Sequence, residues 1–313
     1  MPPKSCPFCK NLSKTIMTEK LRIGKGRVLF CKKCEVGFLE KFVTNEAEYY
    51  NNAYRKKYSH RSESCETNPS EIFNIYKTFQ KDRLSVLKQY VAGKDSLLEL
   101  GASAGQFLVH VKDMFSIVNA IELDSSCVNY IQEMFEIDAD NKTLEHSKFK
   151  NLTYDICCSF QVMEHTSDPK HFLQTIFNAL NHKGIGLIEV PNLYDPLISV
   201  WNIREYSEFY YHEAHNFYFT ENFLRRLSHE TGFKVLQIYF LQDYNILNHL
   251  NWIMNKQPQK TCEIGLNLPE VKSTETEIGT WLSQKLQQLN SEYIKILSEH
   301  KKTSNIMMVL QKI

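Results

Sequence analysis

LLELGASAGQF, residues 97–107, carries an apolar run straight into a turn that holds two glycines. The apolar run predicts a buried strand, and glycine lets the backbone come close to a ligand because it has no Cβ. A strand, a glycine-rich turn and a following helix together make a general site for anions and nucleotides. We therefore expect a nucleotide at the end of this strand and a helix that starts at Gln106.

The glycine spacing argues against a dinucleotide such as NAD. The G-x-G-x-x-G pattern would need three glycines where the chain has Gly101, Ser103 and Gln106. Glu99 lies just ahead of the turn, where its carboxylate would repel a pyrophosphate but attract an ammonium or sulfonium group. The next strand ends at Glu122, a position from which a carboxylate can accept hydrogen bonds from both ribose hydroxyls. These residues favour a positively charged compound that contains a ribose.

Apolar, strand-like runs alternate with helical patterns over residues 96–240. This order predicts βαβ units around a largely parallel sheet. Helices are expected from Ser125, from Pro169 and after Thr220, and the final NIMMVLQKI predicts a last strand. Residues 241–304 break the alternation and predict a long amphipathic helix. Its apolar stripe packs on its own domain or, alternatively, forms a homodimer contact or a lid; the stripe holds Ile278, Leu282, Leu286, Leu289, Tyr293 and Leu297.

These motifs together resemble those of class I S-adenosylmethionine-dependent methyltransferases. Glu99-x-Gly101-x-x-x-Gly105 is similar to their first motif, and Glu122 to their ribose-binding acid. SFQVMEHTSDP, residues 159–169, and LNHKGIGLIEVPN, residues 180–192, are similar to the motif after their fourth strand and the entry into their fifth. The resemblance implies an α/β enzyme with a Rossmann-like, seven-stranded, mostly parallel sheet flanked by helices. It also implies that S-adenosylmethionine lies across the C-terminal strand ends.

The resemblance assigns the cofactor to residues around those strand ends. The backbone from Gly101 to Gly105 is expected under the methionine portion, Glu122 at the ribose and Gln161 beside the methyl group. The adenine contacts are expected from residues 141–144, without a choice among them. The complete predicted cofactor set is Glu99, Gly101, Ala102, Ser103, Gly105, Glu122, Leu123, Thr143, Leu144, Ser159 and Gln161.

A long aromatic connection follows the fifth strand and predicts the acceptor site, since long loops at strand ends commonly bind ligands. HNFYFTENFLRRLSHETGF, residues 215–233, is similar to a segment of the same family in which a histidine corresponds to His215. An imidazole is suited to removing a proton from an acceptor hydroxyl. Catalytic roles are therefore expected for His215 first and then for His165 and Glu164; the alternative is that these groups order a loop or cap strand and helix ends. The residues expected to line the acceptor pocket are Tyr211, His212 and Glu213.

Two Cys-x-x-Cys pairs near the start of the chain predict a structural zinc site made by Cys6, Cys9, Cys31 and Cys34. So short a segment buries too little apolar surface to fold alone, so the metal would supply the folding free energy. A redox role is the alternative, but neither pair opens a helix of a βαβ unit. Residues 1–40 are thus expected to form a zinc ribbon.

The sequence pattern also predicts the boundaries of the other two parts of the chain. Residues 41–92, helical from Ser70 to Tyr90, are expected to bridge the ribbon to the cofactor and substrate side, and residues 93–313 to form the methyltransferase domain with a helical insertion at about 241–304. A zinc ribbon before a Tyr-rich stretch also resembles a subgroup of bacterial methyltransferases that act on sugars or related metabolites. Lys10 and Glu35 stand here where that subgroup has glycines.

Composition narrows the choice of acceptor. Lys and Arg number 37 against 36 Asp and Glu, so the formal net charge of +1 offers no general attraction to nucleic acid or to anionic membranes. The chain has neither an apolar run of membrane-spanning length nor a signal peptide pattern, so a cytoplasmic enzyme is expected. The leading prediction is methylation of a small polar acceptor, a hydroxyl or carbon of a nucleotide-linked or carried sugar. An RNA methyltransferase that uses the ribbon to bind RNA and a non-catalytic scaffold are the alternatives.

Overall fold

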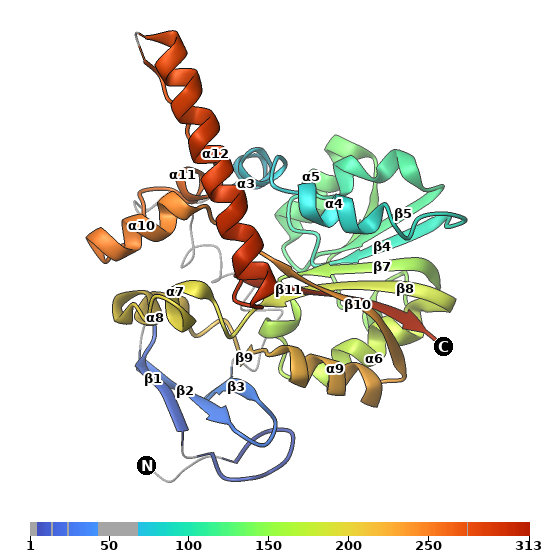
Figure 1. The fold of residues 1–313 in the computed structure, drawn as a ribbon. Helices are drawn as coiled ribbons and strands as arrows, with labels where there is room; N and C mark the ends of the chain where they lie inside the picture. Colours follow the sequence, from blue (N-terminus) through green and yellow to red (C-terminus); the bar gives the residue numbers. More distant parts are fainter. Residues whose placement is uncertain (1–4, 14, 24, 43–67, 274) are drawn as a thin grey trace.

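The computed structural model describes residues 5–13, 15–23, 25–42, 68–273 and 275–313, and a seven-stranded sheet forms its central layer (Figure 1). The strand order is β6-β5-β4-β7-β8-β11-β10. Only β11 runs against the other strands, because it pairs antiparallel with both β8 and β10. The predicted α/β class with a mostly parallel seven-stranded sheet is confirmed. The strands are β4 (Ser96–Leu100), β5 (Ile117–Ile121), β6 (Asp138–Asp140), β7 (Tyr154–Phe160), β8 (Leu180–Pro191), β10 (Phe233–Leu241) and β11 (Asn305–Lys312).

Helices cover both faces of this sheet (Figure 1). One face carries α4 (Lys81–Leu87) and α5 (Ser125–Phe135), whose apolar side chains share a core with β4 and β5. The other face carries α6 (Pro169–Ala179) and α9 (Glu221–Glu230) over a second core. The N-caps of α5, α6 and α9 are Asp124, Asp168 and Thr220, whose side-chain oxygens accept backbone N–H groups of the first turn. These helices begin where the sequence predicts them.

The predicted helix at Gln106 is wrong. The chain forms only two single-turn 3₁₀ helices there, η1 (Leu108–His110) and η2 (Lys112–Met114). The β-branched Val109 and Val111 disfavour an α-helix, and burial of Leu108 and Val111 under the sheet fixes the tight turns instead.

The helical pattern of residues 70–90 is also interrupted. It divides into α3 (Pro69–Tyr76) and α4. The Gln80 side-chain amide donates to the Tyr76 carbonyl at 2.9 Å and thereby satisfies an acceptor that the end of α3 exposes. The earlier part of the bridge, residues 43–67, lies outside the described residues.

A second, four-stranded sheet joins the N-terminal residues to the main domain. Its order is β1-β2-β3-β9, with β1 (Thr15–Lys20), β2 (Lys25–Cys31), β3 (Val36–Leu39) and β9 (Phe217–Tyr218). Strand β9 belongs to the long connection after β8, which also holds the short helices α7 (Pro196–Ser199) and α8 (Arg204–Tyr210). The register pairs Gly37 with Tyr218 and Phe38 with Phe217. Strands β1 to β3, which lie in the predicted ribbon, are thus built onto the segment that follows His215.

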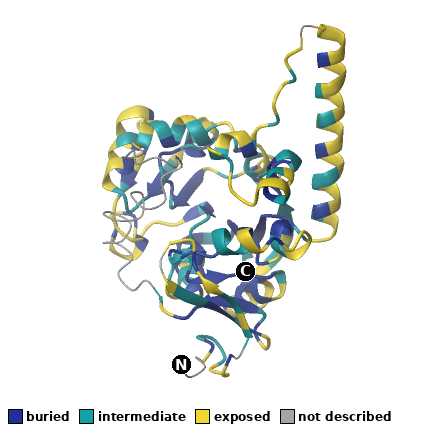
Figure 2. Ribbon diagram, turned by 90° about the vertical axis from the view of Figure 1, so that its left-hand side faces the viewer, coloured by how far each residue is buried: buried dark blue, intermediate teal, exposed yellow. Residues whose placement is uncertain are grey.

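Three helices separate β10 from β11: α10 (Ile246–Asn255), α11 (Cys262–Leu266) and α12 (Thr276–Glu299). Figure 2 shows α12 standing away from the rest of the chain with a largely exposed surface. Of the predicted stripe, Leu297 is buried and Leu286 and Tyr293 are half-buried, whereas Ile278 is 54% exposed. Within the described residues, no helix has the length and apolar character needed to cross a bilayer.

Candidate active site

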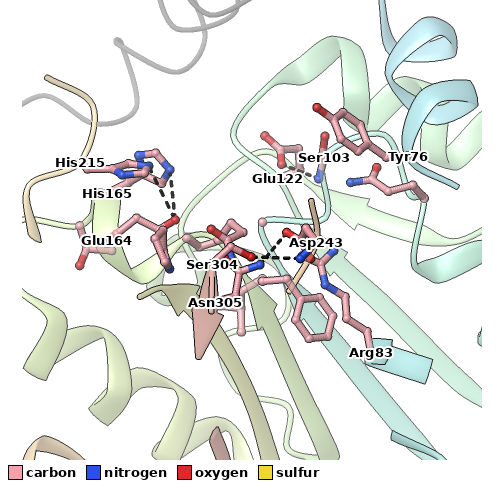
Figure 3. A pocket seen from close by; sticks show the side chains of 18 of the residues that line it. Tyr76, Arg83, Ser103, Glu122, Glu164, His165, His215, Asp243, Ser304 and Asn305 are labelled. Carbon is pink, nitrogen blue, oxygen red and sulfur yellow. Dashed lines mark hydrogen bonds and ion pairs between the residues drawn. The ribbon is translucent and has the colours of Figure 1, made fainter. Parts of the chain in front are cut away.

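A cavity of about 1190 Å³ opens at the C-terminal ends of the parallel strands. Its wall includes the first turn, the loops after β5 and β7, the bridge helices and the connection after β8. Figure 3 shows two groups of side chains within it: Glu122, Ser103 and Tyr76 toward one end, and Glu164, His165 and His215 toward the other. Ligand-binding sites of parallel α/β sheets lie at this edge.

The first turn brings its backbone to the cavity. Gly101 has φ 79° and Gly105 has φ 77°, values that favour glycine. A Cβ on Gly101 would overlap the side chain of Val162, so the close approach of these two segments also requires glycine there. Ser103 occupies the left-handed region at φ 49°, which is how this chain forms the turn without a third glycine. Gly101 and Ser103 line the cavity, whereas Ala102 and Gly105 lie behind them.

Glu122 is held at the cavity edge by the first turn. Its two carboxylate oxygens accept N–H groups from Ser103 at 2.7 Å and from Asp124 at 3.0 Å. A carboxylate has about four acceptor positions, so about two remain for a ligand. Glu122 and Leu123 both line the cavity. The arrangement can bind a pair of hydroxyl groups.

Glu99 is buried beneath the turn and does not line the cavity directly. Its Oε2 atom has no hydrogen-bond partner among the described residues. Burial raises the pKa of Glu99 to about 8; the charge of Arg83 opposes this rise and that of Glu122 adds to it. A nearby cation would stabilise the ionised form of this buried carboxyl. The residues therefore fit a ligand with an ammonium or sulfonium group.

The other predicted cofactor residues divide into two groups. Thr143, Leu144 and Gln161 line the cavity, and Gln161 also has a left-handed φ of 59°. Ser159 is buried within β7 and does not line the cavity. Asn141, one of the residues considered for adenine, lines a separate small pocket, and its amide donates to Ser125 Oγ at 2.9 Å.

An ion pair between Arg83, which lines the cavity, and the buried Glu189 was not predicted from the sequence. Arg83 of α4 donates to the two carboxylate oxygens of Glu189 on β8, at 2.5 and 3.0 Å. Glu189 also accepts from the Gln161 side-chain amide at 3.0 Å. A buried acid inside the apolar run GIGLIEV is the signal that could have revealed Glu189, but nothing local marks Arg83. The pair attaches the bridge to the strand ends.

Glu164, His165 and His215 meet at the other end of the cavity, and we name them the acceptor cluster. Glu164 Oε1 lies 3.7 Å from His165 Nε2 and 3.9 Å from His215 Nε2 (Figure 3). Burial raises the pKa of Glu164 to about 8 and lowers the pKa of His165 to about 4. Burial also lowers the pKa of His215, and the neighbouring His212 and His165 lower it further. Both imidazoles are therefore neutral near pH 7.

The residues predicted to line the acceptor pocket lie in different places. His212 lines the cavity, and its ring centroid is 3.8 Å from that of His215. Tyr211 and Glu213 are not among the lining residues. The Tyr211 ring is instead buried in the core beside Tyr218.

Arg22 reaches the cavity from the turn between β1 and β2. Its Nε donates to the Phe209 carbonyl at 2.6 Å, and its guanidinium lies 3.6 Å from the centroid of the Phe209 ring. The Arg22 backbone N–H also donates to the Tyr211 carbonyl at 2.7 Å. This contact could not be predicted from the sequence, since it depends on how the β1–β2 turn packs on α8.

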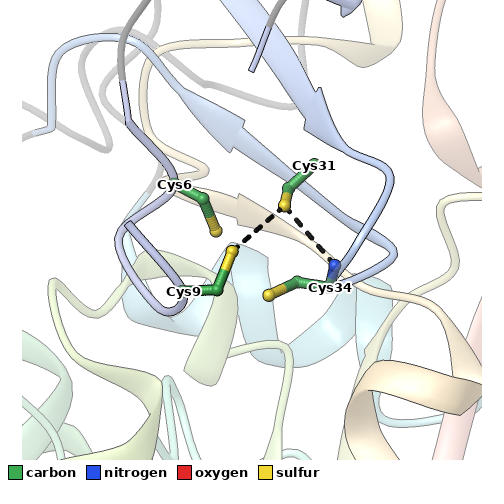
Figure 4. Close-up of side chains that lie close together, drawn as sticks. All are labelled: Cys6, Cys9, Cys31 and Cys34. Carbon is green, nitrogen blue, oxygen red and sulfur yellow. Dashed lines mark hydrogen bonds between the residues drawn. The ribbon is translucent and has the colours of Figure 1, made fainter. Parts of the chain in front are cut away.

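The four predicted zinc cysteines form a compact group (Figure 4). Their sulfur atoms all lie within 4.8 Å of one another, and Cys9 Sγ is 3.6 Å from Cys31 Sγ. The chain turns left-handed directly after each pair, at Lys10 with φ 60° and at Glu35 with φ 57°. Thiolates bound to one zinc ion at about 2.3 Å would have a similar spacing. The donor set and its geometry fit zinc.

Comparison with known proteins identifies the family. A model of the methyltransferase domain matches residues 51–238, more than half of the chain. A protein of Mycolicibacterium smegmatis described as "Probable S-adenosylmethionine-dependent methyltransferase" is 26% identical over 102 residues, which are 32% of this chain and 39% of that protein's length. The crystal structure of an S-adenosylmethionine-dependent methyltransferase from Archaeoglobus fulgidus has a TM-score of 0.50 and 16% identity, covering 78% of this chain and 97% of that chain. The chain therefore belongs to the methyltransferase-domain family, and it shares its fold with an S-adenosylmethionine-dependent methyltransferase.

Proposed function

We propose that this protein transfers a methyl group from S-adenosylmethionine to a small polar acceptor, with a hydroxyl or carbon of a nucleotide-linked or carried sugar as the first candidate. The observation that carries the proposal is a single cavity that has Ser103 and Glu122 at one end and the acceptor cluster at the other. Its volume of about 1190 Å³ exceeds the roughly 300–1,000 Å³ of a typical small-molecule pocket. The cavity thus has room for a cofactor and a second small molecule together.

At the end of the cavity that holds Glu122, the residues present fit the cofactor. Glu122 retains acceptor positions for the ribose hydroxyls. Glu99, whose Oε2 atom has no hydrogen-bond partner among the described residues, would stabilise the positive charge. The backbone of Gly101 lines the cavity where the methionine portion would lie. When bound, S-adenosylmethionine supplies a methyl carbon that its sulfonium group has already activated.

The acceptor cluster performs the remaining task, which is to align the acceptor and to ease loss of its proton. The acceptor oxygen forms a bond to the methyl carbon while the carbon–sulfur bond breaks and leaves its electron pair on sulfur. Holding the reacting atoms in line supplies most of the rate enhancement in such a displacement. Neutral imidazoles at His165 and His215 are able to assist proton removal near pH 7.

The four cysteines are proposed to bind one structural zinc ion and so to form the predicted ribbon. Their compact geometry supports the metal. The arrangement of the ribbon before a methyltransferase domain supports the sugar-related subgroup. The proposed zinc site needs reduced cysteines, and cysteines stay reduced in the cytoplasm. We therefore propose a cytoplasmic location for the protein.

The test combines binding and transfer. Calorimetry with S-adenosylmethionine should show saturable binding, and its absence would favour the scaffold alternative. The protein should then be incubated with methyl-labelled cofactor and either a sugar-nucleotide and metabolite pool or total RNA. Label in a small molecule supports the proposal; label in RNA, falling steeply with added salt, would replace it with the RNA alternative.

A further inference from the structure

We propose that Glu164, His165 and His215 bind a divalent transition-metal ion, separate from the ion held by the cysteines. The site would consist of two imidazole nitrogens and one carboxylate oxygen at the acceptor end of the cavity. Metal binding itself does not depend on the proposed methyl transfer, although the chemical role suggested for the ion does.

The spacing of the three groups supports a shared ion. The Glu164–His165 and Glu164–His215 separations of 3.7 and 3.9 Å exceed the roughly 2.7–3.2 Å of a hydrogen bond. Two ligands that each lie about 2.1 Å from one ion are separated by up to about 4.2 Å, depending on the angle between them. One donor atom from each residue lies within 4.8 Å of the others. The gap between the three groups therefore suits a metal ion better than direct contact.

The tautomer of His165 is fixed in the form that binds metals. Its Nδ1 lies 2.8 Å from the Ala214 carbonyl oxygen, which can only accept, so Nδ1 carries the proton. The lone pair is then on Nε2, the atom that faces Glu164. Metal-binding histidines generally donate their other ring N–H in this way, which fixes the orientation of the ring.

Several buried polar atoms of the site have no hydrogen-bond partner among the described residues. Glu164 is fully buried, and neither of its carboxylate oxygens has a hydrogen-bond partner among the described residues. The same is true of His215 Nδ1. Buried polar atoms without partners carry a free-energy cost, which a bound ion would remove at Glu164.

The backbone around the cluster is held in place. The Asn216 side-chain amide donates to the His165 carbonyl at 2.8 Å and to the Thr166 carbonyl at 3.3 Å. This amide links the loop after β7 to the loop that carries His215. The ligands are therefore arranged before any ion arrives.

Three protein ligands leave coordination positions open, and the cluster lines the cavity where an acceptor would lie. A hydroxyl bound there would ionise more easily, with its proton passing to water in the cavity. The resulting alkoxide would attack the methyl carbon, and the electrons of the carbon–sulfur bond would remain on sulfur. In this arrangement His215 is a ligand and not the proton acceptor. The favoured acceptors would carry two neighbouring oxygens that chelate the ion, such as a vicinal diol or a hydroxy-carbonyl group.

The experiment measures metal binding directly. Zinc-loaded full-length protein is dialysed against Co²⁺ or Mn²⁺, and the bound metals are quantified. We expect about one further equivalent per chain, whose Co²⁺ spectrum lacks thiolate-to-metal charge transfer because its ligands are nitrogen and oxygen. Glu164→Gln and His215→Ala should each weaken this second equivalent about 10- to 100-fold, as for loss of a metal ligand or its support. His229→Ala, an exposed histidine on α9, should not change it.

Two outcomes would overturn the inference: no second equivalent, or a second equivalent that survives both substitutions. Circular dichroism identifies any variant that fails to fold, and His165→Ala then takes its place. S-adenosylmethionine calorimetry on the same samples separates the two proposals. Cofactor binding without a second ion would leave the proposed function intact and reject only the metal site.

Discussion

The two ends of the cavity are assembled in different ways. The cofactor end is made largely from one continuous stretch, residues 99–124, in which a strand, a turn and the next strand end lie side by side. The acceptor end combines Arg22, the loop after β7 and the connection after β8. Local sequence can specify the first end, whereas the second depends on contacts between distant segments. Disturbing a remote element should therefore affect the acceptor end much more than the cofactor end.

The ribbon is the remote element with the most direct connection. The Leu39 N–H donates to the Asn216 carbonyl at 2.9 Å, and the Thr220 hydroxyl donates to the Glu35 carbonyl at 2.6 Å. Together with the β3–β9 pairing, these bonds hold the segment directly after His215. Zinc at the cysteines would thus maintain the position of the acceptor cluster without touching it.

The largest effect is expected from loss of the zinc site. Cys34→Ser should release the ion and unfold the ribbon, because structural zinc supplies about 10–16 kcal/mol in isolated zinc-finger peptides. Methyl transfer should be abolished and amide exchange at Phe217 and Tyr218 should accelerate, while S-adenosylmethionine affinity persists. Cys262→Ser, outside the cysteine group, is the matched control. Parallel loss of cofactor affinity would show that the two ends are not independent.

His215→Ala should have the next largest effect. Loss of an acid–base or metal-binding group at the reacting centre should lower kcat by about 10²- to 10⁴-fold. Calorimetry should find the affinity for S-adenosylmethionine unchanged, because His215 lies at the opposite end of the cavity from Glu122. Glu122→Gln should give the converse, with weaker cofactor binding. Unchanged turnover in His215→Ala would remove this residue from the catalytic cluster.

Gly101→Ala tests the cofactor end itself. An added Cβ would overlap Val162 in addition to straining the backbone at φ 79°. Overpacking of this kind costs about 1–3 kcal/mol, which corresponds to roughly 5- to 200-fold weaker cofactor binding if it acts on the turn. Gly93→Ala is the matched control, since Gly93 also has a positive φ, 69°, but has no atom within 4 Å of the added Cβ. Equal effects of the two substitutions on cofactor affinity would exclude close packing as the cause.

The cofactor end of the cavity could be predicted better than the acceptor end because it is made largely from one continuous stretch of sequence. Continuous apolar runs identify the strands because their side chains are buried on both faces, as in SLLEL of β4. Glu122 could be placed because a strand end fixes its position. Arg83 and Arg22 could not, since each reaches the cavity through the packing of a separate element. The helix expected at Gln106 failed because tertiary burial and β-branched residues outweigh a general pattern of strand, turn and helix.

The smallest effect concerns a single proton at the cofactor end. Burial raises the pKa of Glu99 from 4.5 to about 8. The contribution of Glu99 to the free energy of unfolding therefore falls as the pH rises from 4.5 to about 8. A cation beside Glu99 would favour the carboxylate, so binding of S-adenosylmethionine at pH 7 should release up to about one proton. Calorimetry in two buffers of different ionisation enthalpy measures this release. It should be absent in Glu99→Gln, remain in Glu133→Gln on the exposed surface of α5, and decline above pH 8. Equal release from wild type and Glu99→Gln would mean that Glu99 does not sense the cofactor's charge.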